Sequence, residues 1–185
     1  MTQYHGAQEG LFHVTTNARG RMPWCTIPGV PEIIIDNLRM TRHLYGAKIH
    51  AFCILPDHVH MIVIPGTRGL SDFVHSFKRN SSWQIRRSLS AAEVHEPPLR
   101  ATNTMYMRED SRIFATETGD APTGDIEFTG WQKGFHDERI RDDRQKDAAF
   151  VYVRGNAAHH GLVSDPADWQ WSSLHFFEVV DALEF

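Results

Sequence analysis

Two histidines separated by a single residue, His58 and His60, have the types and the spacing to bind a metal ion. They lie in an apolar run, HVHMIVI, that is typical of a β-strand. Side chains two positions apart on a strand point to the same face, so both imidazoles can reach one ion. Two polar residues on a solvated sheet face would show the same pattern, and the pair alone does not decide between the two interpretations.

A second pair, Tyr152 and Asn156, lies four residues apart in a segment with helical periodicity. That spacing places both side chains on one side of a helix. A tyrosine hydroxyl is a nucleophile once a neighbouring group activates it, and an amide oxygen suits a hard metal. A tyrosine packed at a helix edge beside a polar neighbour is the alternative. Taken together, two imidazoles and one amide oxygen would leave open positions on Mg²⁺ or Mn²⁺ for phosphate oxygens.

The elements that must position these pairs follow from apolar periodicity and from turn residues. The expected elements, in chain order, are a strand at 11–18, a helix at about 31–45, strands at 47–55 and 58–64, a helix from Ser71, a strand at 131–141 and a helix from Asp142 to about His160. This order, β-α-β-β-α-β and then a helix, predicts an α+β fold of the ferredoxin-like type. We expect an antiparallel sheet with helices on one face and an additional C-terminal helix that carries Tyr152.

Composition and charge fit a single domain, 1–185, interrupted by an acidic insertion at about 91–130. The net charge of −4 argues mildly against a nucleic-acid partner. Eight acidic and three basic residues fall within 91–130, however, so this segment carries −5 and the remainder about +1. No apolar run reaches membrane-spanning length and the N-terminus does not read as a signal peptide, so we expect a cytoplasmic protein without a membrane partner. Cys25 and Cys53 are too few for a disulfide framework.

Ordered blocks of sequence resemble the transposases of the HUH superfamily that use one tyrosine, and more narrowly the REP-associated tyrosine transposases of bacteria. The blocks are FHVTTNARGR at 12–21, LPDHVHMIVIP at 55–65, FKRNSSWQIRR at 77–87, YVRGNAAHHGLV at 152–163 and WQWSS at 169–173. The histidine motif alone is weakly specific for this family, whereas the ordered set of blocks is a strong signal. The resemblance spans the whole chain except the acidic insertion.

The resemblance implies a role for each matching residue. His58 and His60 match the metal-binding pair, and Asn156 matches a polar third ligand. Tyr152 matches the nucleophile that forms a 5′-phosphotyrosine link and frees a 3′-hydroxyl. The chain departs from the family pattern at Asp57, where asparagine is frequent, and at Ala157, where proline is frequent.

Further residues are weaker candidates. Four basic residues of the second predicted helix are candidate DNA contacts, although a solvated helix face would look the same: Lys78, Arg79, Arg86 and Arg87. His136 is a candidate auxiliary ligand or proton carrier, with a surface histidine as the alternative. His13 could share the sheet side of the metal pair, but we expect a structural role. His159 and His160 fall near a helix C-terminus and receive no catalytic role here.

The family pattern therefore predicts a metal-dependent single-strand DNA endonuclease and strand transferase that binds DNA hairpins, such as repetitive extragenic palindromes. We expect a bacterial protein associated with the nucleoid when it acts, working as a monomer or a homodimer. Two alternatives stay open. One is a nucleic-acid-binding module of the same fold without cleavage. The other is a metallo-phosphodiesterase for small substrates, in which Tyr152 is only structural.

Overall fold

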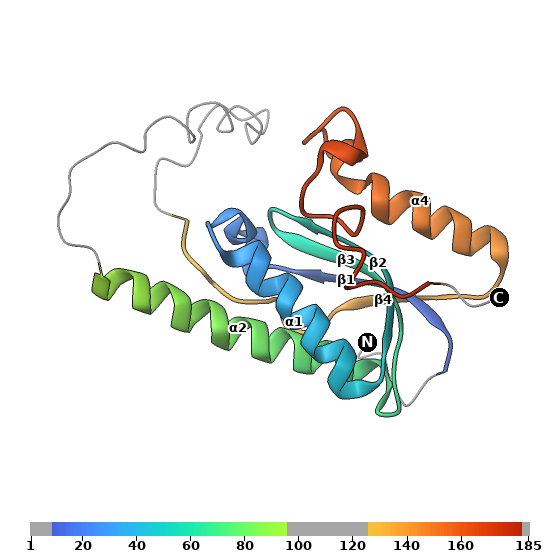
Figure 1. Cartoon of the computed structure of the whole chain (residues 1–185), viewed down its shortest axis with the longest axis horizontal. Coiled ribbons are helices and arrows are strands. Elements are labelled where there is room, and N and C mark those ends of the chain that lie inside the picture. The colour runs from blue at the N-terminus through green and yellow to red at the C-terminus, as the bar shows by residue number, and fades with distance from the viewer. Residues whose placement is uncertain (1–8, 96–125, 183–185) are drawn as a thin grey trace.

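The computed structural model describes residues 9–95 and 126–182. Its main elements are β1 (Leu11–Asn17), α1 (Val30–Tyr45), β2 (Lys48–Leu55), β3 (His58–Ile64), α2 (Gly69–His95), β4 (His136–Ile140) and α4 (Asp143–His159). Short 3₁₀ turns lie at Arg19–Arg21 (η1), Trp24–Thr26 (η2) and Pro166–Asp168 (η3). Figure 1 shows these elements in the colour order of the chain.

The four strands form one antiparallel sheet in the order β2-β3-β1-β4. The second and third strands join through the Pro56–Asp57 turn, and each of the other connections runs through a helix. The predicted ferredoxin-like α+β class is therefore confirmed, with α4 added after the last strand.

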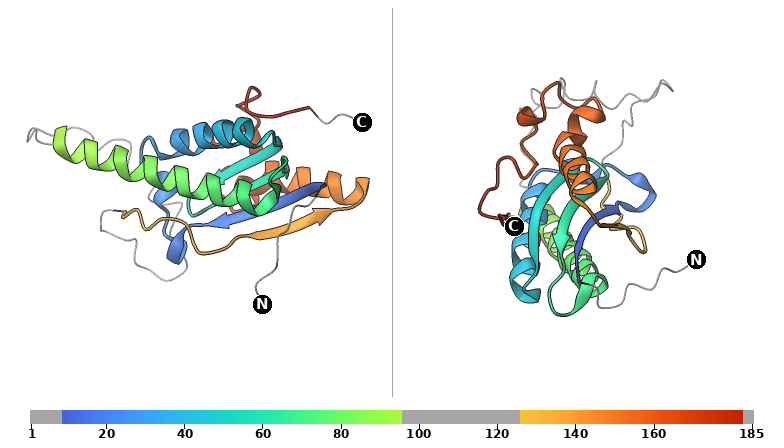
Figure 2. Two further views of the ribbon diagram at one scale, coloured as in Figure 1. Left: turned by 90° about the horizontal axis from the view of Figure 1, so that it is seen from below. Right: turned by 90° about the vertical axis from the view of Figure 1, so that its right-hand side faces the viewer.

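The sheet is covered on both faces, because α1 and α2 lie on one side and α4 on the other (Figure 2). Alternation along β3 explains this. Val59, Met61 and Val63 enter the large apolar core beneath α1 and α2. Ile62 faces the other way and joins a smaller apolar cluster in which α4 contributes Val153. His58 and His60 alternate with Val59 and Met61 along the strand, so they lie on the same face as Ile62 and point toward α4.

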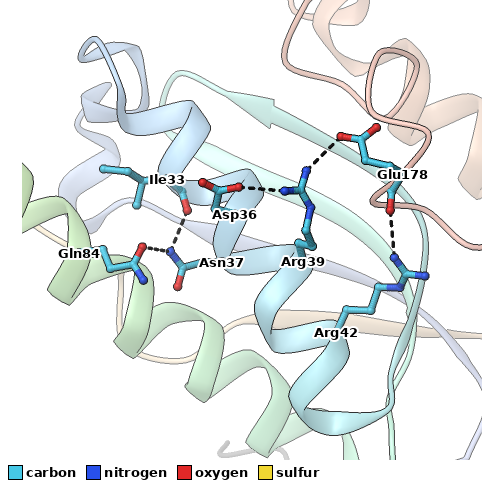
Figure 3. A network of polar contacts seen from close by, with 7 residues as sticks. All are labelled: Ile33, Asp36, Asn37, Arg39, Arg42, Gln84 and Glu178. Carbon is cyan, nitrogen blue, oxygen red and sulfur yellow. Dashed lines mark hydrogen bonds and ion pairs between the residues drawn. The ribbon is translucent and has the colours of Figure 1, made fainter.

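Polar contacts join α1 to α2 and to the C-terminal tail (Figure 3). Asn37 donates from Nδ2 to Gln84 Oε1 of α2 at 2.9 Å. On its other side, Arg39 reaches Glu178 Oε1 at 3.1 Å, and Arg42 donates to the Glu178 carbonyl at 3.2 Å. These contacts hold the C-terminal tail against α1, and the backbone nitrogens of Ser173 and Asp181 hold it against β2 at the sheet edge by donating to the carbonyls of Phe52 and Ile49.

The boundaries differ from the sequence predictions around the acidic insertion. The helix α2 continues to His95, past the predicted start of the insertion at 91. The strand β4 begins only at His136, because Gly134 adopts a left-handed φ of 80° and residues 132–135 follow an irregular path. Trp131, expected to begin the strand, makes an isolated bridge with Ala18. The remainder of the insertion, 96–125, lies outside the described residues. Among described helices, none is long and apolar enough to cross a membrane.

Candidate active site

The two histidines of β3 lie at the end of the strand nearest the β2–β3 turn. His60 pairs with Thr15 of β1 on one side and with Cys53 of β2 on the other, while His58 pairs with Asn17. Both rings are almost fully buried, at 4% and 5% exposure, and their centroids lie 4.9 Å apart. The predicted convergence of the two imidazoles on one face is therefore present.

The Nδ1 atom of His60 is occupied by neighbours on β1. Thr15 Oγ1 lies 2.9 Å away and His13 Nε2 lies 3.0 Å away. Burial, and after it the charges of nearby histidines and of Arg21, lowers the pKa of His60 to about 2. The ring is therefore neutral at physiological pH, which is the form that binds metals, and Nε2 is the nitrogen left for a ligand.

A carboxylate and an arginine hold His58. The Nδ1 atom of His58 donates to Asp57 Oδ1 at 2.5 Å, and Arg21 Nε binds the second oxygen of Asp57 at 2.7 Å. Burial opposes the charge on Asp57, but the hydrogen bond from His58 and the charges of His58 and Arg21 outweigh it and lower the pKa of this carboxyl. A carboxylate on Nδ1 fixes the tautomer of His58 and leaves Nε2 available.

Arg21 reaches Asp57 from an unusual backbone conformation. Its φ of 56° is the only positive value among the described non-glycine residues, and it directly follows Gly20, whose φ is 67°. The Nη1 atom of Arg21 also donates to Asn17 Oδ1 at 2.6 Å. Left-handed backbone at a non-glycine residue costs about 1 kcal/mol or more. The contacts to Asp57 and Asn17 compensate for this cost at the edge of the site.

The helix α4 brings Tyr152 to the histidines. Asp142 caps the helix by accepting from the Gln145 backbone nitrogen at 2.8 Å, and Gly161, with a φ of 69°, follows its end. The Tyr152 ring is 43% exposed and stands edge-on to two rings of the sheet, with centroids 5.3 Å from His60 and 5.6 Å from His13. One chain thus brings the predicted nucleophile and the histidine pair together, while the phenol stays open to solvent.

Asn156 lies one turn after Tyr152, on the buried side of α4. It is fully buried, and neither Oδ1 nor Nδ2 has a hydrogen-bond partner among the described residues. A buried amide without partners costs about 1–3 kcal/mol. Other buried polar atoms of the described ranges also lack a partner, among them Thr41 Oγ1 and Ser173 Oγ, but Asn156 differs from these in lying one turn from the candidate nucleophile.

Among the described residues, no three His, Cys, Asp or Glu side chains are grouped so that they could hold a metal ion. A metal at this site would therefore need a ligand of another kind besides the two histidines. Asn156 is the candidate from the sequence, and its unpartnered amide oxygen is of the type that suits a hard divalent cation. Two imidazoles and one amide oxygen would leave positions open on a divalent cation.

Two histidines that received no role from the sequence also lie at the site. The His160 ring is 5.3 Å from that of His58, and the His159 ring is 6.1 Å from that of Tyr152. Their position depends on how α4 docks, which the sequence does not reveal. His136 of β4 pairs with Thr15 of β1, which in turn pairs with His60 of β3. His136 therefore lies on the same face of the sheet as the site, but it is two strands from His60 and is exposed. Its auxiliary role stays a prediction.

The four basic residues of α2 divide into two groups. Lys78 points inward, where its ammonium donates to the carbonyls of Gln132, at 2.6 Å, and Gly134. Burial lowers its pKa to about 8. These contacts give Lys78 a part in holding the segment before β4, and they favour a structural role over a DNA contact. The other three are exposed: Arg79, Arg86 and Arg87.

A family model described as "Transposase IS200 like" matches residues 10–97 of this chain. The match contains the His58–His60 strand and α2, and ends before Tyr152. A protein of Haemophilus influenzae (strain ATCC 51907 / DSM 11121 / KW20 / Rd), named as a REP-associated tyrosine transposase, is 25% identical over 138 residues. That alignment covers 74% of this chain and 64% of the relative, so the chain spans less than two thirds of the relative's length.

A solved structure of a REP-associated tyrosine transposase bound to a REP hairpin shares the fold. It superposes with a TM-score of 0.64 at 17% identity, covering 100% of this chain and 91% of the other. The sequence matches confirm the resemblance to the REP-associated tyrosine transposases, and the structural match confirms the α+β fold.

Proposed function

Because this chain is similar to the REP-associated tyrosine transposases, we propose that the protein is a metal-dependent endonuclease and strand transferase that acts on single-stranded DNA next to hairpins. The observation that carries the proposal is the position of Tyr152. A half-exposed phenol on α4 stands 5.3 Å, ring to ring, from the buried His60, and one helical turn from an unpartnered Asn156. In the proposal, this nucleophile, the two imidazoles and the amide oxygen form one site.

In the proposed reaction, the Tyr152 hydroxyl oxygen attacks the phosphorus of one phosphodiester. The bond from phosphorus to the 3′ oxygen breaks, and that oxygen takes a proton to become a 3′-hydroxyl. The phenol proton passes to solvent, and the fragment downstream of the break stays linked to the tyrosine through its 5′ phosphate, as a phosphodiester. Attack by a 3′-hydroxyl on this link would reverse the step and join strands.

His58, His60 and Asn156 would hold the divalent metal. When bound, it supplies charge stabilisation and orientation for the phosphate. The chain prepares both histidines for this task. Asp57 engages Nδ1 of His58, while Thr15 and His13 engage Nδ1 of His60, so that each ring keeps Nε2 for the metal.

The substrate class follows from the accessibility of Tyr152 and from the relative's hairpin. A single strand can bend into a narrow site between a helix and a sheet, whereas a stacked duplex resists that distortion. The solved relative is bound to a REP hairpin. We therefore propose that this chain binds an imperfect hairpin and cleaves in the flanking single strand.

The test is an adduct assay with a labelled hairpin that carries single-stranded flanks, in the presence of Mn²⁺. Wild type should give a covalent protein–DNA band, and Tyr152→Phe should give none. The control is Tyr45→Phe, which removes a hydroxyl at the end of α1 and should leave the band intact. Hairpin binding without any metal-dependent adduct would instead favour a binding module. Cleavage of a small phosphodiester by Tyr152→Phe would favour a metallo-phosphodiesterase.

A further inference from the structure

An exposed tryptophan stands among arginines on the outer side of α2. Trp83 is 58% exposed, and the guanidinium of Arg87 lies 5.3 Å from its ring centroid. Arg79 is one turn before Trp83 and Arg87 one turn after it, so the three side chains follow one line along the helix. An exposed aromatic ring flanked by cations is an arrangement on which unpaired bases of nucleic acid can stack.

A third arginine, Arg86, connects this line to residues 128–130. The Arg86 guanidinium lies 5.4 Å from the ring centroid of Phe128 and close to Gly130, where a Cβ atom would meet it at 3.5 Å. The Gly130 carbonyl accepts from the Arg19 backbone nitrogen at 2.8 Å. The exposed surface around Arg86 therefore continues onto the η1 turn.

The η1 turn leads to the site itself. It begins at Arg19 and ends at Arg21, whose guanidinium binds Asp57, the neighbour of His58. We call the set that starts beside this ion pair and crosses to α2 the basic track: Arg19, Arg86, Arg87, Trp83 and Arg79. Arg21 is excluded, because Asp57 and Asn17 occupy it.

Charge along the basic track favours an anionic partner. Within the described residues, none of its arginines is in an ion pair, while Asp57 at its end is neutralised by Arg21. Glu127 is an exposed carboxylate beside Phe128, so the track keeps a positive excess. Phe177, an aromatic residue that is 75% exposed, lies next to Glu178 and lacks this setting.

We propose that the basic track is a second DNA-binding surface, separate from the cleavage centre. Its arginines bind phosphates, and Trp83 stacks on an unpaired base of the hairpin or its flank. Phosphate contacts supply affinity without sequence readout, and an aromatic face selects bases that are free to unstack. The inference rests on the proposed function for the identity of the ligand as DNA.

This arrangement gives the two sides of the sheet different tasks. The helix α2 lies on the opposite side of the sheet from α4, and its later turns extend beyond the ends of the strands (Figures 1 and 2). DNA held on the basic track would pass around η1 to reach Tyr152. Binding and cleavage would then depend on different residues of one domain.

The experiment measures binding by fluorescence anisotropy, with chelator present so that no strand is cut. The probe is the flanked hairpin of the adduct assay. Trp83→Ala should weaken affinity by about tenfold or more, and Trp83→Phe should keep most of it, because stacking needs the ring. Arg86→Ala and Arg87→Ala should each reduce the slope of log affinity against log salt by about one.

Matched controls come from the exposed surface elsewhere. Phe177→Ala removes an aromatic that is even more exposed than Trp83, and Arg144→Ala removes an exposed arginine from the first turn of α4. Both should bind like wild type. If Trp83→Ala binds as tightly as Phe177→Ala, the proposal of the basic track is wrong. Equal losses for Trp83→Phe and Trp83→Ala would exclude stacking.

The basic track and the catalytic proposal fail separately. A covalent adduct in wild type, with unchanged binding by the variants of α2, would overturn the track alone. Weakened binding by Trp83→Ala, without any adduct in wild type, would support the track and overturn the cleavage chemistry.

Discussion

Asn37 and Asn156 are both fully buried, on opposite sides of the sheet. On the side of α1 and α2, the Asn37 amide nitrogen donates to the Ile33 carbonyl at 2.8 Å and to Gln84 at 2.9 Å. On the side of α4, neither amide atom of Asn156 has a partner among the described residues. Within the same residues, Asn37 Oδ1 lacks a partner as well, so the contrast lies in the amide nitrogens: that of Asn37 joins α1 to α2, whereas that of Asn156 is left available, as on a ligand-binding face.

The largest expected effect lies in the core beneath α1 and α2. Phe52 of β2 is fully buried there and packs near Phe176 of the tail, with ring centroids 6.1 Å apart. Phe52→Ala should lower the free energy of unfolding by about 3–5 kcal/mol, because it removes a large side chain from a packed interior. Urea denaturation measures this. A loss under about 1 kcal/mol would mean that this side is not the stabilising one.

The two asparagines should respond oppositely to an apolar replacement of similar size. Asn156→Leu should raise the free energy of unfolding by about 1–3 kcal/mol, because it removes a buried amide without partners. Its Mn²⁺ binding, measured by calorimetry, should fall. Asn37→Leu is the matched control and should be destabilising, since two hydrogen bonds are lost. If Asn156→Leu is the less stable variant of the two, the contrast between the two sides is wrong.

Asp57 should matter more for the metal than for the fold. Asp57→Asn removes the carboxylate that fixes the ring of His58 and should weaken Mn²⁺ affinity about tenfold, or ~1.4 kcal/mol. In the metal-free protein, nitrogen NMR should show His58 moving from one tautomer to a mixture. An unchanged tautomer together with unchanged affinity would show that Asp57 does not orient this histidine.

The smallest effect concerns the inward-pointing lysine of α2. Lys78→Met should lower the free energy of unfolding by about 1 kcal/mol, because two carbonyls before β4 lose their donor. Hydrogen exchange should increase at residues 131–135. DNA affinity should stay within twofold of wild type, in contrast to Arg86→Ala. A loss of DNA affinity as large as that of Arg86→Ala would return Lys78 to the DNA-binding residues.

Periodic patterns in the sequence predicted the features that depend only on residues close together in the chain. The alternation of β3 placed His58 and His60 on the face opposite Val59, and helical spacing put Tyr152 near Asn156. The remaining contacts depend on tertiary structure. Arg21 reaches Asp57 only through a left-handed turn, His160 reaches His58 only because α4 docks on the sheet, and Lys78 turns inward only because residues 132–134 pass beneath it. None of these leaves a periodic signal in the sequence.

The central claim is that Tyr152 becomes joined to DNA at the site it shares with His58 and His60. The most direct measurement digests the wild-type adduct and locates the nucleotide by mass spectrometry. We expect one modified peptide, with the 5′ phosphate of the cleaved strand on Tyr152. A nucleotide on another residue, or cleavage without any protein-linked nucleotide, would contradict the account.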